Sequence, residues 1–259
     1  MTAIIEARGL AYAYPDGTPA LDDISFSIER GQCAGLVGPS GAGKSTLALC
    51  LTGLIFPQAG ELRIETARIS RKNAREARQK IGLIFQNPDD QLFMPTLFDD
   101  VAFGLLQHGF KGAEVEQRVK KALADRGIER LAPKFPGHLS GGQKRLAALA
   151  AVLVMAPEVL ILDEPSSNLD PRSRRSLIQQ LAALDNTRLI LSHDLEMILD
   201  LAGRVLVMSE GRIIADGDPE KILGDHDLMQ AHGLEVPHSL QPHRHDHLPH
   251  RLKRQPTAP

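Results

Sequence analysis

The chain has 259 residues, 42% hydrophobic and 24% charged, which suits one large α/β domain or one domain with a subdomain and a tail. Its formal net charge of −2 offers no basic surface of the kind that binds nucleic acid. The two cysteines, Cys33 and Cys50, have neither metal nor redox spacing and indicate buried free thiols in a reducing compartment.

The N-terminal third has the pattern of strands joined by turns. Hydrophobic and polar residues alternate over 3–14 and 21–28, as in half-buried strands, with the turn residues "YPDGTP" between them. The run "CAGLVG" predicts a buried strand that leads through a loop into a helix. Residues 60–65 and 81–85 predict two further strands, and the polar stretch "RKNAREARQK" between them predicts a helix.

The middle of the chain has a helical pattern. No strand-like run occurs over 93–137, and we expect a helical subdomain over about 93–155. Thr96 precedes Asp99 at the spacing of a capping box, although Asp is a weaker partner than Glu. The longest apolar run, 146–156, is much shorter than the roughly 20 residues that a membrane span needs, and the N-terminus has no signal pattern. We therefore expect a chain that is soluble by itself and reaches a membrane only through a partner.

The C-terminal third returns to alternating strands and helices. "VLILDEP" predicts a buried strand, a helix follows from about Pro171, and "RLILSHD" predicts the next strand. Residues 204–217 predict a hairpin around Glu210 and Gly211. The segment 225–259 is polar and rich in His and Pro, so we expect one folded domain over 1–224, followed by a short C-terminal segment and a His-rich tail.

The stretch "GPSGAGKS" matches the phosphate-loop pattern G-x-x-x-x-G-K-S between a predicted strand and a predicted helix. Glycines let backbone N–H groups surround a β-phosphate, and the helix N-terminus adds a partial positive charge. Lys44 supplies a charge between the β- and γ-phosphates, and the Ser45 hydroxyl can bind Mg²⁺. The predicted nucleotide-binding residues are Gly38, Pro39, Ser40, Gly41, Ala42, Gly43, Lys44, Ser45 and Thr46.

Further polar residues follow the other buried strands. Asp163 is placed to hold the Mg²⁺ shell, and Glu164 to orient or deprotonate an attacking water. His193 ends a strand one helix later, which predicts a parallel neighbour and puts the imidazole near the γ-phosphate. Each of these residues alone is most often structural. Joined to the phosphate loop, they predict a hydrolytic site with catalytic Lys44, Glu164 and His193 and with the Mg²⁺ ligands Ser45, Gln86 and Asp163.

The stretch "LSGGQ" offers a second glycine-rich turn before a helix, but with no lysine in the turn. Ser140, Gly141 and Gly142 could bind a γ-phosphate that another segment already holds. That nucleotide belongs either to the same chain or to a second copy in a two-fold dimer. The dimer is favoured, because the helical subdomain carries "LSGGQ" away from the sheet.

Taken in order, "GPSGAGKST", Gln86, "LSGGQ", "LILDEP", "SSNLD" and His193 resemble the ATP-binding subunit of an ABC transporter over about residues 4–224. The resemblance implies an α/β P-loop ATPase core, with a mainly parallel sheet, helices on both faces, an antiparallel β subdomain and an inserted α-helical subdomain. It implies ATP held between two such domains and Tyr14 stacked on the adenine. The residues implied to act in trans are Ser140, Gly141, Gly142, Gln143 and Asp170. The family often has Gly at the position of Asn168.

A narrower resemblance concerns "QNPDDQLFMPTLFDDVAFG" and "HGLEVPHS", which are similar to the ATPase subunits of energy-coupling-factor importers for vitamins or for cobalt and nickel ions. It implies a groove near Gln86 that receives a coupling helix of a membrane partner. Phe93 and Phe98 are candidates for lining it, or else belong to the core of the subdomain.

The stretch "HSLQPHRHDHLPHRLKRQ" contains five histidines, and imidazoles suit Ni²⁺, Co²⁺, Cu²⁺ and Zn²⁺. A flexible tail would bind such ions weakly, and a solvated tail without a ligand is the alternative. The cluster favours a transition-metal cargo over a vitamin. Its members are His238, His243, His245, His247 and His250.

We therefore expect an ATPase that uses ATP and Mg²⁺ and lies peripherally on the cytoplasmic face of the cell membrane. Its expected partners are a second ATP-binding subunit, an integral membrane coupling subunit and a substrate-binding membrane subunit. A soluble ABC ATPase acting on DNA or ribosomes is a weaker alternative, because the chain between Gln86 and Ser140 is too short for a long coiled-coil insertion. A regulatory module without turnover conflicts with the presence of both Glu164 and His193.

Overall fold

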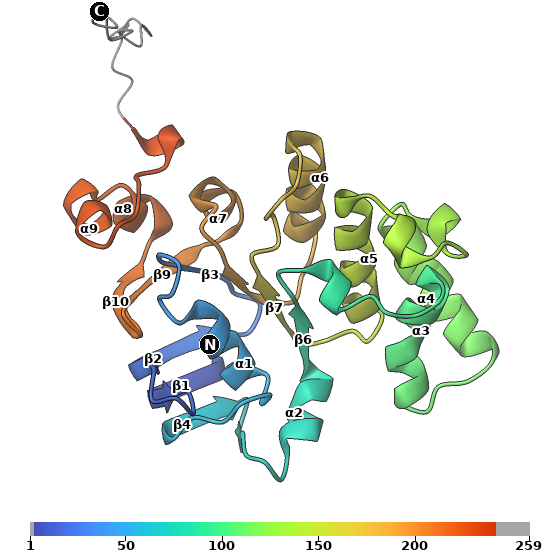
Figure 1. The fold of residues 1–259 in the computed structure, drawn as a ribbon, viewed down its shortest axis with the longest axis horizontal. Coiled ribbons are helices and arrows are strands. Elements are labelled where there is room, and N and C mark those ends of the chain that lie inside the picture. The colour runs from blue at the N-terminus through green and yellow to red at the C-terminus, as the bar shows by residue number, and fades with distance from the viewer. Residues whose placement is uncertain (1–2, 242–259) are drawn as a thin grey trace, which may run out of the picture.

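The computed structural model describes residues 3–241 and shows two sheets and a helical subdomain (Figure 1). The first sheet is antiparallel and has the order β2-β1-β4-β5. Its strands begin and end at β1 Ala3–Ala13, β2 Pro19–Glu29, β4 Ala59–Ile64 and β5 Ala67–Arg68.

The second sheet has the order β10-β9-β3-β8-β7-β6 and is parallel except for β10, which forms a hairpin with β9. The strands β3, β7 and β8 are buried along their whole length, as expected of parallel strands covered on both faces. The parallel pairing of β7 with β8 confirms the neighbour relationship predicted from their spacing. The strands are β3 Cys33–Val37, β6 Ile81–Ile84, β7 Val159–Asp163, β8 Thr187–Leu191, β9 Arg204–Ser209 and β10 Arg212–Gly217.

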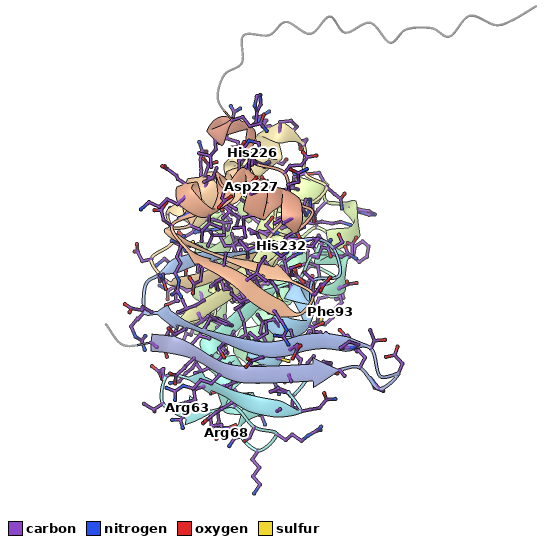
Figure 2. The ribbon with its side chains drawn as sticks, turned by 90° about the vertical axis from the view of Figure 1, so that its left-hand side faces the viewer. Arg63, Arg68, Phe93, His226, Asp227 and His232 are labelled. Carbon is purple, nitrogen blue, oxygen red and sulfur yellow. The ribbon has the colours of Figure 1, made fainter. Side chains whose placement is uncertain are left out.

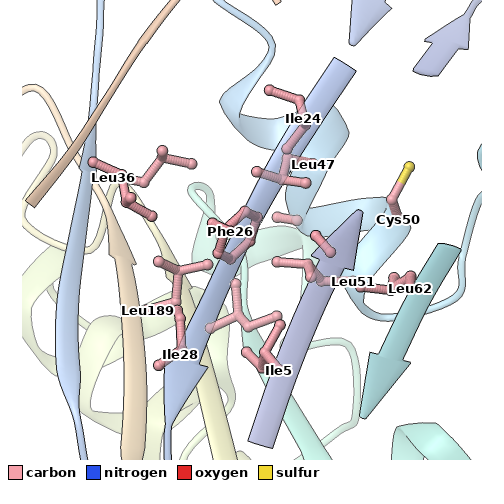
Figure 3. Close-up of a cluster of buried hydrophobic side chains, with 14 of the residues drawn as sticks. Ile5, Ile24, Phe26, Ile28, Leu36, Leu47, Cys50, Leu51, Leu62 and Leu189 are labelled. Atoms are coloured by element: carbon pink, nitrogen blue, oxygen red, sulfur yellow. The ribbon is translucent and has the colours of Figure 1, made fainter. Parts of the chain in front are cut away.

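One core lies between the two sheets and encloses α1 (Lys44–Leu51). Figure 3 shows Leu47 and Leu51 of this helix among Ile5, Ile24 and Phe26 of the antiparallel sheet. Burying a leucine side chain stabilises a fold by about 2 kcal/mol, so this packing holds the start of α1 firmly. Cys33 and Cys50 are both buried and free, as predicted, and burial raises the pKa of the Cys50 thiol to about 12.

A second core covers the other face of the parallel sheet. It contains side chains of α6 (Pro171–Ala182) and α7 (Leu195–Leu201), together with Leu149 of α5 (Gly141–Leu153). The polar stretch before β6 forms the short helix α2 (Ala74–Lys80).

The helical subdomain has a core of its own, formed by residues between Leu92 and Val154. Thr96 caps its first helix by accepting from the Asp99 N–H, but its hydroxyl donates to the Asp99 carboxylate, so only half of the capping box forms. The helices and single turns are α3 Leu97–Gln107, α4 Ala113–Asp125, α5 Gly141–Leu153, η1 Pro88–Asp90, η2 Glu129–Leu131 and η3 Pro136–His138.

The folded part of the chain extends beyond the boundary expected at residue 224, and this is a correction. After α8 (Pro219–Leu223), α9 (His226–Ala231) buries Met229 in the second core, and Ser239 of η4 (His238–Leu240) donates to Glu196 of α7. These elements are too short to show a clear hydrophobic period, so the sequence pattern does not reveal them.

The expected histidine cluster is represented in the structure by His238 alone, because His243, His245, His247 and His250 lie outside the described residues. Figure 2 shows His226 and His232 on the C-terminal segment, at the end of the molecule opposite Arg63 and Arg68. No group of three or more side chains suited to a metal ion occurs among residues 3–241. Within the same range, no helix combines the length and the apolar character that crossing a bilayer requires.

Candidate functional site

The carboxyl ends of four adjacent parallel strands form one edge of the second sheet. The loop after β3 carries the phosphate-loop residues, β6 leads to Gln86, β7 ends at Asp163 and β8 leads to His193. Ligands of open α/β sheets bind at such an edge. A cleft of about 450 Å³ lies there, lined by residues of all the predicted cis-acting motifs, namely Tyr14, Ser40, Gly41, Ala42, Gly43, Lys44, Ser45, Thr46, Gln86, Glu164 and His193.

The phosphate loop is shaped by close backbone packing. Gly43 has φ +102°, and a Cβ atom there would lie 2.3 Å from the carbonyl oxygen of Ala20, so only glycine fits. Lys44 follows at the first position of α1 and is buried. Its ammonium group donates to the carbonyl oxygens of Gly38 (2.7 Å) and Pro39 (3.0 Å), and burial lowers its pKa.

Asp163 is the buried end of β7, and its oxygen Oδ1 has no hydrogen-bond partner in the described part of the chain. Burial raises the pKa of this carboxyl, while a hydrogen bond from the Ser45 hydroxyl opposes the rise. An orphaned carboxylate oxygen beside a hydroxyl matches the all-oxygen ligand set that Mg²⁺ prefers. Gln86 is exposed and lines the same cleft. The residues predicted to hold Mg²⁺ therefore fit the ion.

Glu164 is held in an unusual backbone conformation, with φ +45° in the left-handed region. Its carboxylate accepts from the Ser192 hydroxyl (3.1 Å) and from the backbone N–H of His193 (3.1 Å), and the His193 ring Nδ1 lies 2.8 Å from Oε2. The imidazole itself is exposed toward the cleft. Sequence reasoning missed Ser192, although the "SH" pair after a buried strand was the available signal.

Tyr14 follows the end of β1, and 39% of its surface is exposed. Its hydroxyl lies 2.8 Å from the Thr46 hydroxyl oxygen, and its ring packs edge-to-face against Tyr12. An aromatic face at the mouth of the cleft is suited to stacking on a flat ring.

Ser140 caps α5 in a complete capping box: its hydroxyl accepts from the Gln143 N–H, and the Gln143 side chain accepts from the Ser140 N–H. The spacing S-x-x-Q is the signal that sequence reasoning overlooked. Ser140, Gly142 and Gln143 line a separate hollow of about 630 Å³ beside α6. None of these residues lines the phosphate-loop cleft, so within the described chain the two motifs face different spaces.

The stretch "SSNLD" connects Glu164 to α6. Asn168 has φ +59°, a left-handed conformation that Gly and Asn adopt most easily, which explains why asparagine replaces glycine there. Asp170 caps α6 by accepting from the backbone N–H groups of Arg172 and Ser173, and hydrogen bonds to Ser173 lower its pKa. Its carboxylate is thus already engaged by its own helix.

The comparisons with known proteins agree with this arrangement. Residues 21–167 match the family model described as ABC transporter. The chain is 45% identical over 239 residues to an energy-coupling factor transporter ATP-binding protein of Methanothermobacter thermautotrophicus, a match that covers 90% of this chain and 77% of that protein.

Two solved structures are also similar. One is cbiO1 of Clostridium perfringens, described as part of the ABC transporter complex cbiONQ, with a TM-score of 0.79, 37% identity and coverage of 89% of this chain and 94% of that one. The other is a dimeric ATP-binding cassette in a post-hydrolysis state with ADP and phosphate, with a TM-score of 0.75, 25% identity and coverage of 83% and 98%.

The fold and the cleft define a P-loop ATPase, which confirms the predicted α/β class. The chain belongs to the ABC transporter family as an ATP-binding subunit that hydrolyses ATP, and it resembles the subunits of energy-coupling-factor transporters.

Proposed function

We propose that the chain drives a membrane importer of the energy-coupling-factor type, and that two ATP-binding subunits form two composite ATP sites. The observation that carries this proposal is the separation of the two phosphate-binding motifs. Lys44 and Ser140 line different hollows of one chain, although both motifs are built to contact a phosphate. A two-fold arrangement would let Ser140, Gly141, Gly142, Gln143 and Asp170 of one copy face the cleft of the other.

Gly141 supports this arrangement. A Cβ atom at Gly141 would meet no atom of the chain within 4 Å, so the fold of one copy gives no reason for glycine there. At Gly142 a Cβ atom would lie 2.5 Å from the Ser173 hydroxyl oxygen, so packing within one copy already requires glycine at that position. An open glycine at a helix N-terminus permits the close approach of a ligand held by another chain.

In this mechanism, Lys44 and the backbone of the phosphate loop bind the β- and γ-phosphates, and Tyr14 stacks on the adenine. Ser45, Asp163 and Gln86 would hold Mg²⁺, which neutralises charge on the phosphates when it is bound. Glu164 takes a proton from the attacking water, and His193 lies beside Glu164 in the lining of the cleft that would hold the γ-phosphate. Hydrolysis then removes the phosphate that joins the two copies, and the domains separate.

A surface for the membrane partner lies on the helical subdomain. Phe93 is 62% exposed and packs edge-to-face against Phe103, with 5.2 Å between the ring centroids, and Leu106 is also exposed. Phe98, the other candidate, packs against the core of the subdomain instead. Phe93 follows the loop of Gln86 closely, so a coupling helix bound here would sense nucleotide-dependent movement of that loop. A membrane partner bound at this surface would hold the chain peripherally on the cytoplasmic face of the membrane.

The cargo we favour is a cobalt or nickel ion, and a vitamin is the alternative. The support is the resemblance to the energy-coupling-factor group and the run of histidines after residue 237. Uptake of labelled Co²⁺ or Ni²⁺ by cells that carry this chain with its membrane partners would support the metal, whereas uptake of labelled biotin alone would contradict it.

A mixture of two inactive variants tests the composite sites. Lys44→Ala removes the charge from one copy's cleft, and Ser140→Arg blocks the start of α5 in the other copy. In the mixed dimer, one site carries both defects and the other carries neither. We expect phosphate release to exceed that of either variant alone. A mixture with no gain would contradict sites shared between chains, because sites within one chain would all stay damaged.

A further inference from the structure

Arg145 is a buried cation without an acidic partner. It lies in the first turns of α5, is 3% exposed, and takes part in none of the ion pairs found among residues 3–241. Its guanidinium group donates to the carbonyl oxygens of Phe85 (2.8 Å) and Gln86 (2.8 Å) and contacts the Ser167 hydroxyl at 3.4 Å. Carbonyl dipoles of the loop after β6 therefore replace much of the water around this charge, while its Nε has no hydrogen-bond partner in the described part of the chain.

The same helix holds that loop at two more points. The Lys144 ammonium pairs with Asp89 at 2.6 Å. Gln91 donates to the carbonyl oxygen of Ala148 (3.2 Å) and accepts from the N–H of Phe85 (3.3 Å). Residues 85–91 are thus fastened along α5, and Arg145 makes the only one of these contacts that is both charged and buried.

Stability alone does not explain a charge in this place. Removing an ion from water is costly, and well-packed apolar side chains of similar volume often stabilise a buried site as well or better. What an apolar residue would not provide is directional hydrogen bonds from α5 to two other segments at once. Those segments are the loop of Gln86 and the connection that contains Ser167. Arg145 itself belongs to α5, the helix that Ser140 caps.

We propose that Arg145 is a positioning residue that makes the orientation of Ser140 follow the position of Gln86. Arg145 does not line the phosphate-loop cleft, and in the hollow of Ser140 it is only 3% exposed, so it acts on the reaction through the segments that it joins. When nucleotide and Mg²⁺ draw Gln86 toward the cleft of one copy, the guanidinium group turns the start of α5 with it. The serine then reaches the orientation needed for the other copy's nucleotide. This inference rests on the proposed composite sites.

Arg145→Met tests the inference, with Arg188→Met as the matched control. Arg188 is also a buried arginine: it donates to the carbonyl oxygen of Leu181, and its Nε has no partner in the described part of the chain. It lies near the start of β8, at the opposite end of that strand from His193. Both variants remove a buried charge, but only the first separates α5 from the loop of Gln86.

The measurements use the full chain. We expect Arg145→Met to leave the Kd for Mg-ATP within about twofold, and to lower kcat and ATP-driven dimerisation about tenfold or more. Arg188→Met should keep the wild-type kcat and dimerisation, even if its Tm falls as much as that of Arg145→Met. Hydrogen exchange should become faster at the amides of residues 85–91 in Arg145→Met only.

Wild-type kcat and dimerisation in Arg145→Met would overturn the inference. Equal losses in Arg188→Met would also overturn it, because the effect would then be general destabilisation. A failure of the proposed function gives a different result, namely wild-type turnover that does not depend on Glu164. In that case the hydrogen-exchange rates of the amides of residues 85–91 still decide whether Arg145 attaches the loop of Gln86 to α5.

Discussion

The Nδ1 atom of His193 lies 2.8 Å from Oε2 of Glu164, and the backbone N–H of His193 donates to the same carboxylate. The end of β8 therefore orients the side chain that follows β7, across two strands that pair in parallel. Ser192 adds a third contact to this carboxylate. A buried acid held at three points, beside an exposed imidazole, is well arranged to direct a water at a fixed target.

Glu164→Gln should bind ATP and lose turnover. Glutamine has the same size and its amide oxygen can still accept from Ser192 and His193, but it cannot take a proton from water. We expect kcat to fall at least about a hundredfold and ATP to hold two copies together. Phosphate release and size-exclusion chromatography with Mg-ATP measure the two effects. Normal turnover in this variant would refute the assigned role of Glu164.

Asp163→Asn should make the nucleotide-free chain more stable at neutral pH. Burial raises the pKa of Asp163, so the folded chain binds a proton more readily than the unfolded chain. The native state consequently loses stability as pH rises above the ordinary aspartate pKa of about 4. Removing the charge should add about 1 kcal/mol to the free energy of unfolding at pH 7 and flatten this pH dependence.

The same substitution tests the metal ligands. Thermal melts with ADP should show that Mg²⁺ raises Tm in the wild type but not in Asp163→Asn. Asp100→Asn is the control, because Asp100 is also buried with a raised pKa, but it lies in the helical subdomain. If Mg²⁺ stabilised Asp163→Asn as strongly as the control, Asp163 would not be a ligand.

Tyr14→Ala should weaken nucleotide binding, because the ring is expected to stack on the adenine. Aromatic stacking contributes about 0.5–1.5 kcal/mol, so Kd for ATP should rise by about twofold to tenfold. Tyr14→Phe keeps the ring and removes only the hydroxyl that contacts Thr46, and its Kd should stay close to that of the wild type. Titration with a fluorescent ATP analogue measures both. An equal loss in the two variants would assign the effect to the hydroxyl instead.

Gly141→Ala and Gly142→Ala should impair different properties, namely dimerisation and stability respectively. A methyl group at 142 would displace the Ser173 side chain from Asp170, and such overpacking costs about 1–3 kcal/mol of stability. A methyl group at 141 meets nothing in the chain, so Tm should not fall. It should instead impede ATP-driven dimerisation, which sedimentation velocity would detect. Wild-type dimerisation in Gly141→Ala would argue against the approach of a partner's nucleotide there.

Local patterns of the sequence were sufficient for most of the site in one chain. The phosphate loop, Asp163 and His193 each follow a short buried strand, and parallel strands bring their carboxyl ends to a common edge. The hairpin at Glu210 and Gly211 was predicted for a similar reason, because its turn residues are adjacent in the sequence.

The contacts that local patterns missed join residues far apart. Arg145 reaches Phe85 across 60 residues, and Tyr14 reaches Thr46 across 32. An arginine in a polar stretch is expected to be solvated, but the fold buries Arg145. Met229 was expected to belong to a tail, but it packs in the second core. Burial depends on the packing of the whole chain, so it cannot be predicted from any single stretch of the sequence.

The nucleotide-binding α/β core and a candidate hydrolytic carboxylate could be predicted from the amino-acid sequence alone, because those motifs consist of neighbouring residues with fixed chemistry. That Ser140 and Lys44 line different hollows, and that Arg145 attaches the loop of Gln86 to α5, is visible only in the folded chain. Those relations depend on how the helical subdomain packs against the sheet. That packing is the sum of many weak apolar contacts spread over the whole chain.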